Sequence, residues 1–156
     1  MAHAQTGSVR AAPFDEIAVI DLAGAQSSLR TQMRGPTVLN IWATWCPPCR
    51  TEMPSLEKLG QLVAPDGVDV VALSVDTDSN LVREFVLKYG LTLPVSIAVA
   101  PDQAMNRLEV VGLPLTLYLD ANGRIVGRHV GQRDWAADDA VTEVRRRLQM
   151  PAGQRR

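Results

Sequence analysis

The only two cysteines of the chain, Cys46 and Cys49, are separated by two prolines. Apolar residues on both faces of 37–42 predict a buried strand before them, and residues 47–64 have the spacing of a helix. Two thiols at the point where a strand passes into a helix can form and break a small-loop disulfide. The first thiol also lies near the unpaired N–H groups and the positive dipole end of the helix. The pattern therefore predicts thiol–disulfide exchange.

The two cysteines have different expected roles. Cys46 is the expected nucleophile, because only a thiolate attacks a disulfide and a helix N-terminus in a C-x-x-C motif can lower a cysteine pKa from about 8.5 to roughly 7. Cys49 should lie one turn further in, less exposed, and should attack the mixed disulfide formed at Cys46. Pro47 and Pro48 lack backbone N–H groups, which predicts a less stabilised thiolate and a more reducing pair than Gly-Pro would give.

Metal binding is a second interpretation of the same thiols. Zinc takes about four ligands, and the only histidines, His3 and His129, fall in a loose tail and in a predicted strand. Thiolates are soft ligands that favour copper(I), so a copper(I)-delivery module using Cys46 and Cys49 stays open as the alternative function. We expect no resident metal, and no cofactor other than the redox-active disulfide itself.

Length and charge limit the classes of protein to be considered. The 156 residues suit one domain with a full core, and the net charge of -1 gives no electrostatic case for nucleic acid or anionic membrane as a partner. No stretch approaches the roughly 18 apolar residues that a membrane span needs. Residues 2–4, Ala-His-Ala, fit the end of a signal peptide. An upstream targeting segment and an ordinary disordered start both stay open.

The rest of the chain alternates between strand and helix patterns. The predicted elements are a strand within 14–22, a strand at 68–75, a helix at 80–89, a strand at 93–99, a helix at 103–109, a hairpin of 115–119 and 124–130 around Asn122-Gly123, and a last helix that starts near an N-cap at Asp134. Pro54 should kink or interrupt the helix at 47–64. This order predicts an α/β domain over 13–150, with a mixed sheet and helices on both faces, between flexible tails at 1–12 and 151–156.

Two stretches carry a resemblance to a known family. Residues 39–54, Leu-Asn-Ile-Trp-Ala-Thr-Trp-Cys-Pro-Pro-Cys-Arg-Thr-Glu-Met-Pro, and residues 111–114, Val-Gly-Leu-Pro, resemble the thioredoxin fold. Within that fold they resemble the TlpA/ResA group of extracytoplasmic thiol–disulfide proteins, and the similarity runs from about 14 to 148. Residues 131–136 look most like TlpA.

The resemblance implies a fold, an activity and a setting. The fold is a thioredoxin-like domain with a central mixed sheet flanked by helices and with an N-terminal β extension. The implied activity is that of a protein-disulfide reductase, kept reduced by a membrane thiol electron donor. Its clients would be disulfide-bearing proteins in cytochrome c maturation or in assembly of the cytochrome oxidase copper site. We expect a monomer in the periplasm or another extracytoplasmic space.

The resemblance also implies a substrate-binding surface. The family places a cis proline beside the disulfide, which here is Pro114, and the backbone of the preceding Leu113 would pair with an extended client segment. Trp45 should lie against the disulfide and provide an apolar platform, with Pro47 and Pro48 beside it.

A third expected catalytic residue is Glu52, one helical turn after Cys49. Members of the ResA group carry a glutamate there that influences proton transfer, and a carboxylate at that place can act as a base for Cys49. The alternative is an exposed helix glutamate. Thioredoxin has a buried aspartate six residues before its first cysteine, but the corresponding residue here is Asn40, which cannot shuttle protons. Family members usually carry threonine where this chain has Leu115.

A peroxiredoxin-like peroxidase on the same fold is excluded by its motif. Such enzymes carry Pro-x-x-x-Thr-x-x-Cys, whereas the corresponding positions before Cys46 are Leu39 and Ala43.

Overall fold

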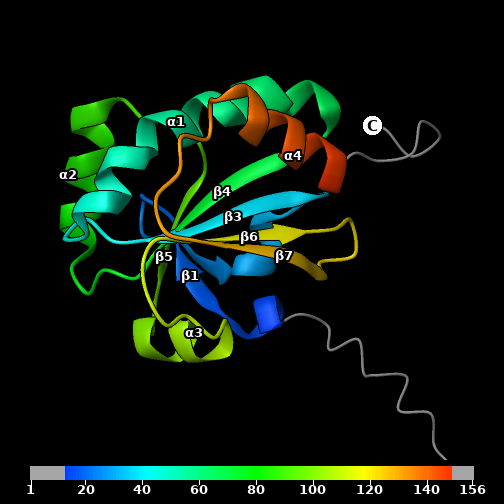
Figure 1. Ribbon diagram of the computed structural model, residues 1–156. Coiled ribbons are helices and arrows are strands. Elements are labelled where there is room, and N and C mark those ends of the chain that lie inside the picture. Colours follow the sequence, from blue (N-terminus) through cyan, green and yellow to red (C-terminus); the bar gives the residue numbers. More distant parts are fainter. Residues whose placement is uncertain (1–12, 149–156) are drawn as a thin grey trace, which may run out of the picture.

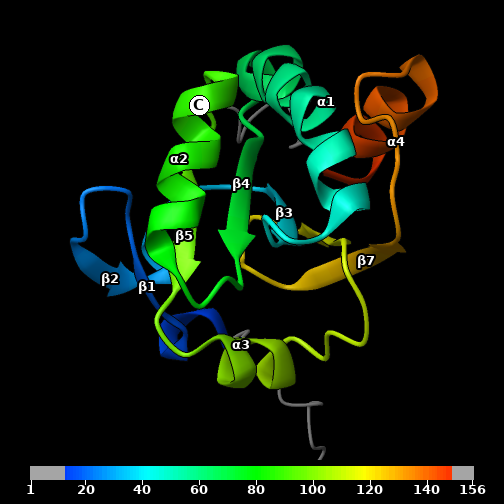
Figure 2. The same ribbon diagram turned by 90° about the vertical axis from the view of Figure 1, so that its left-hand side faces the viewer.

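The structure, a computed structural model, describes residues 13–148 and is built from seven strands and four α-helices (Figures 1 and 2). The strands are β1 (Ala18–Ile20), β2 (Gln26–Ser28), β3 (Thr37–Trp42), β4 (Asp69–Ser74), β5 (Val95–Ala98), β6 (Leu115–Leu119) and β7 (Ile125–Val130). The α-helices are α1 (Pro47–Val63), α2 (Ser79–Tyr89), α3 (Pro101–Arg107) and α4 (Asp138–Leu148). Short 3-10 helices are Pro13–Glu16, Leu29–Gln32 and Ala64–Asp66.

The strands form one mixed sheet in the order β2-β1-β5-β4-β3-β6-β7. β3 pairs in parallel with β4 and antiparallel with β6, while β1 pairs antiparallel with both β2 and β5. Helices α1, α2 and α4 cover one face of the sheet and α3 lies on the other (Figures 1 and 2). The predicted mixed sheet with helices on both faces is confirmed, and β1 with β2 supplies the predicted N-terminal β extension.

The strand before the cysteines lies inside the sheet, between β4 and β6. All six residues of β3 are buried, which is why the sequence shows apolar residues on both faces rather than alternation. β3 ends at Trp42, and α1 begins five residues later at Pro47. The loop between them, which carries Cys46, therefore leaves the sheet from its middle.

Helix α1 packs on the sheet through a stripe of residues spaced three and four apart, namely Cys49, Glu52, Met53, Leu56, Leu59 and Val63. The helix runs unbroken from Pro47 to Val63 with Pro54 inside it, so the predicted interruption is wrong. Proline removes one N–H donor from the helical ladder. Here the buried stripe on either side of Pro54 holds the two parts of the helix on the same sheet face.

Several element boundaries differ from the prediction: α3 begins and ends two residues earlier than predicted, β5 is shorter, and the first strand and the last helix differ most. The stretch at 14–22 begins with a 3-10 helix, Pro13–Glu16, and only Ala18–Ile20 is strand. This arrangement buries Phe14 and Ile17 together, three residues apart. Helix α4 starts at Asp138 rather than near Asp134, whose carboxylate accepts a hydrogen bond from the Ala136 N–H in a turn instead.

The predicted helix at 80–89 and the predicted hairpin are confirmed. Asp78, which was not predicted as a cap, caps α2 by accepting from the Asn80 N–H, and Gly90 ends that helix in the left-handed conformation at φ 61°. The hairpin of β6 and β7 turns at Gly123, whose φ is 77°. Strand β2 was not predicted, because Gln26–Ser28 contains no apolar residue.

Some predictions fall outside the described residues: the flexible tails at 1–12 and 151–156, the end of the domain at 149–150, and the signal-peptide-like start. None of the helices between 13 and 148 is long and apolar enough to cross a bilayer.

Candidate active site

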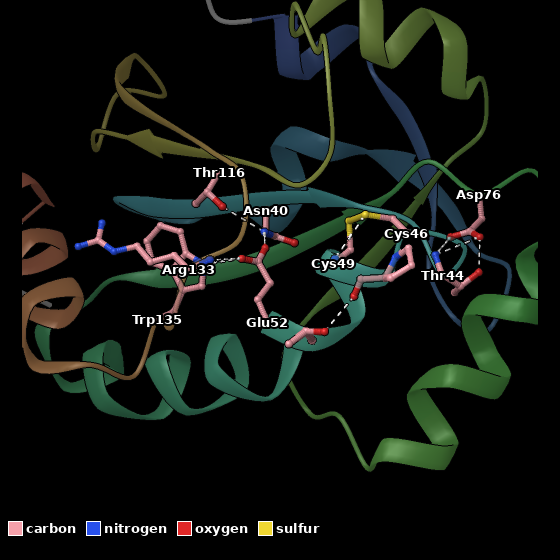
Figure 3. The surroundings of a disulfide bond; sticks show 11 residues. Asn40, Thr44, Cys46, Cys49, Glu52, Asp76, Thr116, Arg133 and Trp135 are labelled. Atoms are coloured by element: carbon pink, nitrogen blue, oxygen red, sulfur yellow. Dashed lines mark hydrogen bonds between the residues drawn. A yellow bond between two sulfur atoms is a disulfide. The ribbon is translucent and has the colours of Figure 1, made fainter.

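Cys46 and Cys49 are joined by a disulfide at the N-terminus of α1, with their Cα atoms 5.3 Å apart (Figure 3). Cys46 is the N-cap residue, and its Sγ accepts a hydrogen bond of 3.4 Å from the Cys49 N–H. Pro47 and Pro48 fill the first two helical positions and have no N–H. The Cys49 N–H is therefore the first-turn donor directed at Cys46.

The two cysteines differ in exposure in the predicted order. Cys46 is 6% exposed and Cys49 is fully buried. In the disulfide form Cys46 is thus itself buried, although less completely than Cys49.

A buried aspartate fixes the loop that carries Cys46. Asp76, just after β4, accepts hydrogen bonds from the Thr44 N–H at 3.0 Å and from Thr44 Oγ1 at 2.5 Å (Figure 3). It also accepts from Ser74 Oγ at 2.6 Å. Sequence reasoning missed Asp76. The available signal was an acidic residue directly after a buried strand, next to the strand that leads to the cysteines.

Glu52 is buried, not an exposed helix residue, so the alternative interpretation of it is wrong. Its Oε1 accepts from Asn40 Nδ2 at 2.7 Å, and its Oε2 accepts from the Arg133 N–H at 3.0 Å and from Trp135 Nε1 at 3.1 Å (Figure 3). Burial raises the pKa of Glu52 above its ordinary value of 4.5, and these hydrogen bonds oppose the rise. The site thus contains a carboxyl group prepared to hold a proton more tightly than a free glutamate.

The segment before α4 supplies two of these donors, which sequence reasoning did not identify as part of the site. The Arg133 guanidinium pairs with Glu143 of α4 at 2.8 Å and lies 5.2 Å from the centroid of the Trp135 ring. This pairing holds the segment in place, so that Trp135 Nε1 faces Glu52. The likeness of residues 131–136 to one branch of a family was the only sequence signal for it.

Asn40 connects Glu52 to the sheet. Its Nδ2 donates to Glu52 Oε1 and also to Thr116 Oγ1 at 3.1 Å, across the pairing of β3 with β6. Asn40 is fully buried. It cannot exchange a proton itself, as predicted, but it fixes the position of the carboxyl group that can.

The predicted substrate-binding residues lie at the same edge of the sheet as the cysteines. The Leu113–Pro114 peptide is cis, as predicted, and it precedes Leu115, which pairs with Ile41 near the end of β3. Pro114 is buried and Leu113 is half-buried.

The apolar surface next to the disulfide is formed by its chain neighbours. Trp45 is 65% exposed, and Pro47 and Pro48 are also exposed. An exposed tryptophan with two prolines is a rigid apolar surface, as the predicted platform requires.

His129, the histidine whose position the structure describes, packs against an aromatic ring and not against the cysteine pair. His129 lies on β7 and packs edge-on against the Trp135 ring, with centroids 5.4 Å apart. Within residues 13–148, no group of three or more His, Cys, Asp or Glu side chains is arranged to hold a metal ion. His3 lies outside the described residues.

Comparison with known proteins identifies the fold. The thioredoxin domain of a thiol-disulfide oxidoreductase from Bacteroides vulgatus superposes with a TM-score of 0.72, over 83% of this chain and 91% of that domain, at 22% identity. The fold is therefore the predicted thioredoxin-like α/β fold, with a C-x-x-C pair at the start of its first long helix. A family model described as Redoxin matches residues 10–144, and the chain belongs to the redoxin family.

Named relatives confirm the predicted resemblance to the ResA group. Thiol-disulfide oxidoreductase ResA of Halalkalibacterium halodurans is 36% identical over 114 residues, which are 71% of this chain and 62% of the relative. ResA of Geobacillus thermodenitrificans is 39% identical over 106 residues, 67% of this chain and 60% of the relative. The matched region spans about three fifths of each relative. The narrower likeness to TlpA stays a prediction.

Proposed function

We propose that this protein is a thiol–disulfide oxidoreductase that reduces disulfides in client proteins through Cys46 and Cys49. The observation that carries the proposal is the position of Cys46 Sγ, which caps α1 and accepts the Cys49 N–H while bonded to Cys49. A thiolate at a helix N-terminus is stabilised by that N–H and by the helix dipole. The named relatives are thiol-disulfide oxidoreductases, which supports the same chemistry.

The reaction follows from the order of exposure. The Cys46 thiolate attacks one sulfur of a client disulfide, so that a mixed disulfide forms and the other client sulfur leaves as a thiolate. Cys49 then loses its proton and attacks Cys46 Sγ, which closes the Cys46–Cys49 disulfide and releases the second client sulfur. Two electrons have passed from the pair to the client. A membrane dithiol donor returns them and leaves as a disulfide.

Glu52 is the proposed base for the second step. It lies three residues after Cys49 on the same buried stripe of α1, where positions three apart are neighbours. Its raised pKa lets it hold the Cys49 proton at a pH where a surface glutamate would stay ionised. Its three hydrogen bonds keep the carboxyl group in place through the cycle.

The proposed client surface combines the exposed Trp45, Pro47 and Pro48 with Leu113 and Pro114, which precede β6 at the end of β3 that leads to Cys46. The apolar side chains would contact the client, and the Leu113 backbone would pair with an extended segment of it. We propose clients in cytochrome c maturation or in copper-site assembly of cytochrome oxidase, in an extracytoplasmic compartment. The pair of thiols needs no other cofactor, and the protein acts as a monomer.

The test is to trap the client. Cys49→Ser stops the second step, so a covalent adduct at Cys46 should accumulate, and mass spectrometry of the adduct names the client. The Cys46→Ser/Cys49→Ser double variant is the matched control and should form none. A Cys49→Ser protein that gathers no adduct above this control under native extracytoplasmic conditions contradicts the proposal.

Copper(I) titration separates the alternative function. A delivery module should bind copper(I) tightly through both reduced thiols, whereas a reductase should lose activity in Cys46→Ala regardless of metal. Tight copper(I) binding together with no disulfide reduction would favour the carrier.

A further inference from the structure

The side-chain amide oxygen of Asn40, Oδ1, is a buried acceptor that accepts no hydrogen bond in the site. Asn40 is fully buried, and among residues 13–148 its Oδ1 has no hydrogen-bond partner. Buried side-chain oxygens are almost always paired, so an unpaired one at the centre of a site needs a functional explanation. The residue lies on β3, directly beneath α1, which carries Cys49 and Glu52.

The orientation of this amide is fixed by its other contacts. Asn40 Nδ2 donates to Glu52 Oε1 at 2.7 Å and to Thr116 Oγ1 at 3.1 Å, so both of its hydrogens are used. Turning the amide over would place Oδ1 against the Glu52 oxygen, two acceptors together. The oxygen must therefore point away from Glu52 and Thr116, and Figure 3 shows it on the side of the amide that faces the disulfide.

In the reduced protein, Cys49 is the group that needs a hydrogen-bond acceptor. It is fully buried, so water does not reach its sulfur. In the disulfide form Cys49 Sγ carries no proton and cannot donate. Reduction by a dithiol donor breaks the S–S bond, transfers two electrons and leaves a proton on Cys49, which creates a buried S–H donor beside the unused acceptor.

We propose that Asn40 is a positioning residue whose Oδ1 accepts the Cys49 S–H in the reduced protein and thereby stabilises the reduced form relative to the disulfide. This inference rests on the redox cycle of the proposed function. It gives Asn40 a role distinct from proton transfer. The amide holds the Cys49 proton on the sulfur while its Nδ2 holds Glu52, the group that later removes that proton.

The first test is the thiol–disulfide equilibrium with glutathione at pH 7. Asn40→Leu removes the unpaired acceptor from the disulfide form and the S–H bond from the reduced form. It also removes the donor to Glu52 and Thr116, a loss that both forms share. The equilibrium should move toward the disulfide by about fivefold, which corresponds to about 1 kcal/mol or about 20 mV.

Thr116→Val is the matched control for this measurement. It removes one partner of Nδ2 but leaves Oδ1 in place, so its equilibrium should stay within about twofold of the wild type. If the equilibrium constant of Asn40→Leu equals that of Thr116→Val, or shifts toward the reduced form, the inference is wrong while the proposed function stands. If the wild-type pair does not exchange with glutathione at all, both are wrong.

A second measurement detects the hydrogen bond of the Cys49 thiol directly. In the Cys46→Ser variant the only thiol is Cys49, and its S–H stretching band in the Raman spectrum reports directly on hydrogen bonding. The band should lie at the lower frequency of a bonded thiol and should rise to that of a free thiol when Asn40→Leu is added. A free-thiol frequency with Asn40 present overturns the inference.

Discussion

Trp135 Nε1 donates a hydrogen bond of 3.1 Å to Glu52 Oε2, joining residues that are 83 positions apart in the chain. The Arg133 N–H donates to the same oxygen, and the Arg133 side chain is tied to Glu143 of α4. The segment before the last helix thus controls a carboxyl group one turn from the cysteine pair. Charge at the redox site depends on a part of the chain that contains neither cysteine.

Removing the indole donor should change Glu52 specifically. In Trp135→Phe the aromatic packing is kept but the hydrogen bond to the carboxylate is lost, so the pKa of Glu52 should rise further. Hydrogen bonds to charged groups contribute about 1.5–3 kcal/mol, and the free energy of unfolding above that pKa should fall by about this amount. The carboxyl carbon of Glu52, followed by NMR against pH, reports the shift.

Trp42→Phe is the matched control for this prediction. Trp42 is also fully buried, but within residues 13–148 its Nε1 has no partner. This variant should leave the titration of Glu52 where it is in the wild type. Equal titrations in the Trp135→Phe and wild-type proteins would show that the indole contact does not act on the carboxyl group.

Stability should depend on pH through Glu52. Because its pKa is raised in the folded protein, the folded state binds the proton more tightly than the unfolded state. The free energy of unfolding should therefore be largest below about pH 4.5 for this group and fall as pH rises through the raised pKa, by at most about 1.4 kcal/mol per pH unit.

Urea unfolding at a series of pH values measures this slope. Glu52→Gln should flatten it and should also shift the pH dependence of disulfide exchange. The exposed Glu84→Gln is the control for loss of a carboxylate at the surface. An unchanged slope in Glu52→Gln would mean that the buried carboxyl group does not titrate in this range.

Loss of the hydrogen bonds between Asp76 and the loop that carries Cys46 should change the reactivity of Cys46 as well as the stability of the fold. Asp76→Ala leaves the Thr44 N–H without its acceptor and should lower the free energy of unfolding by about 2–4 kcal/mol, as expected for several hydrogen bonds to one carboxylate. It should also change the alkylation rate of reduced Cys46. Asp78→Ala removes only the cap of α2, which contributes about 1 kcal/mol, and should leave that rate alone. Equal alkylation rates in both variants would contradict the loop-fixing role.

The prolines between the cysteines should set the redox potential. Pro47→His restores a backbone N–H in the first turn of α1 and adds a side chain that can carry positive charge, and both stabilise the Cys46 thiolate. The potential against glutathione should rise by on the order of 30 mV, a tenfold change in equilibrium. Pro101→His, at the start of α3, makes the same change away from the sulfurs and should have no effect. A redox potential of Pro47→His equal to that of the wild type would show that the prolines do not set the potential of the pair.

Local patterns predicted most of the fold and the reacting atoms. The buried strand β3, the hairpin at Asn122-Gly123 and the C-x-x-C pair each depend on neighbouring residues, and each is found as predicted. The partners of these groups could not be predicted in the same way. Asp76 reaches Thr44 only because β4 lies beside β3, and no local pattern encodes that contact.

The burial of Glu52 was the other property that the sequence did not reveal. At its place in α1, Glu52 could be either an exposed residue or part of the stripe that faces the sheet. Three donors, Asn40 Nδ2, the Arg133 N–H and Trp135 Nε1, make its burial possible, and two of them come from a segment with no apolar periodicity. An unpaired buried carboxylate would be too costly, so the burial and the donors had to be found together.

Alkylation of the fully reduced protein at neutral pH, with the labelled thiol identified by mass spectrometry, tests the central claim most directly. A short exposure to iodoacetamide should modify Cys46 well before Cys49, because Cys46 is the less buried thiol and caps the helix. Modification of Cys49 first, or of neither thiol, would contradict the assignment of Cys46 as the attacking sulfur.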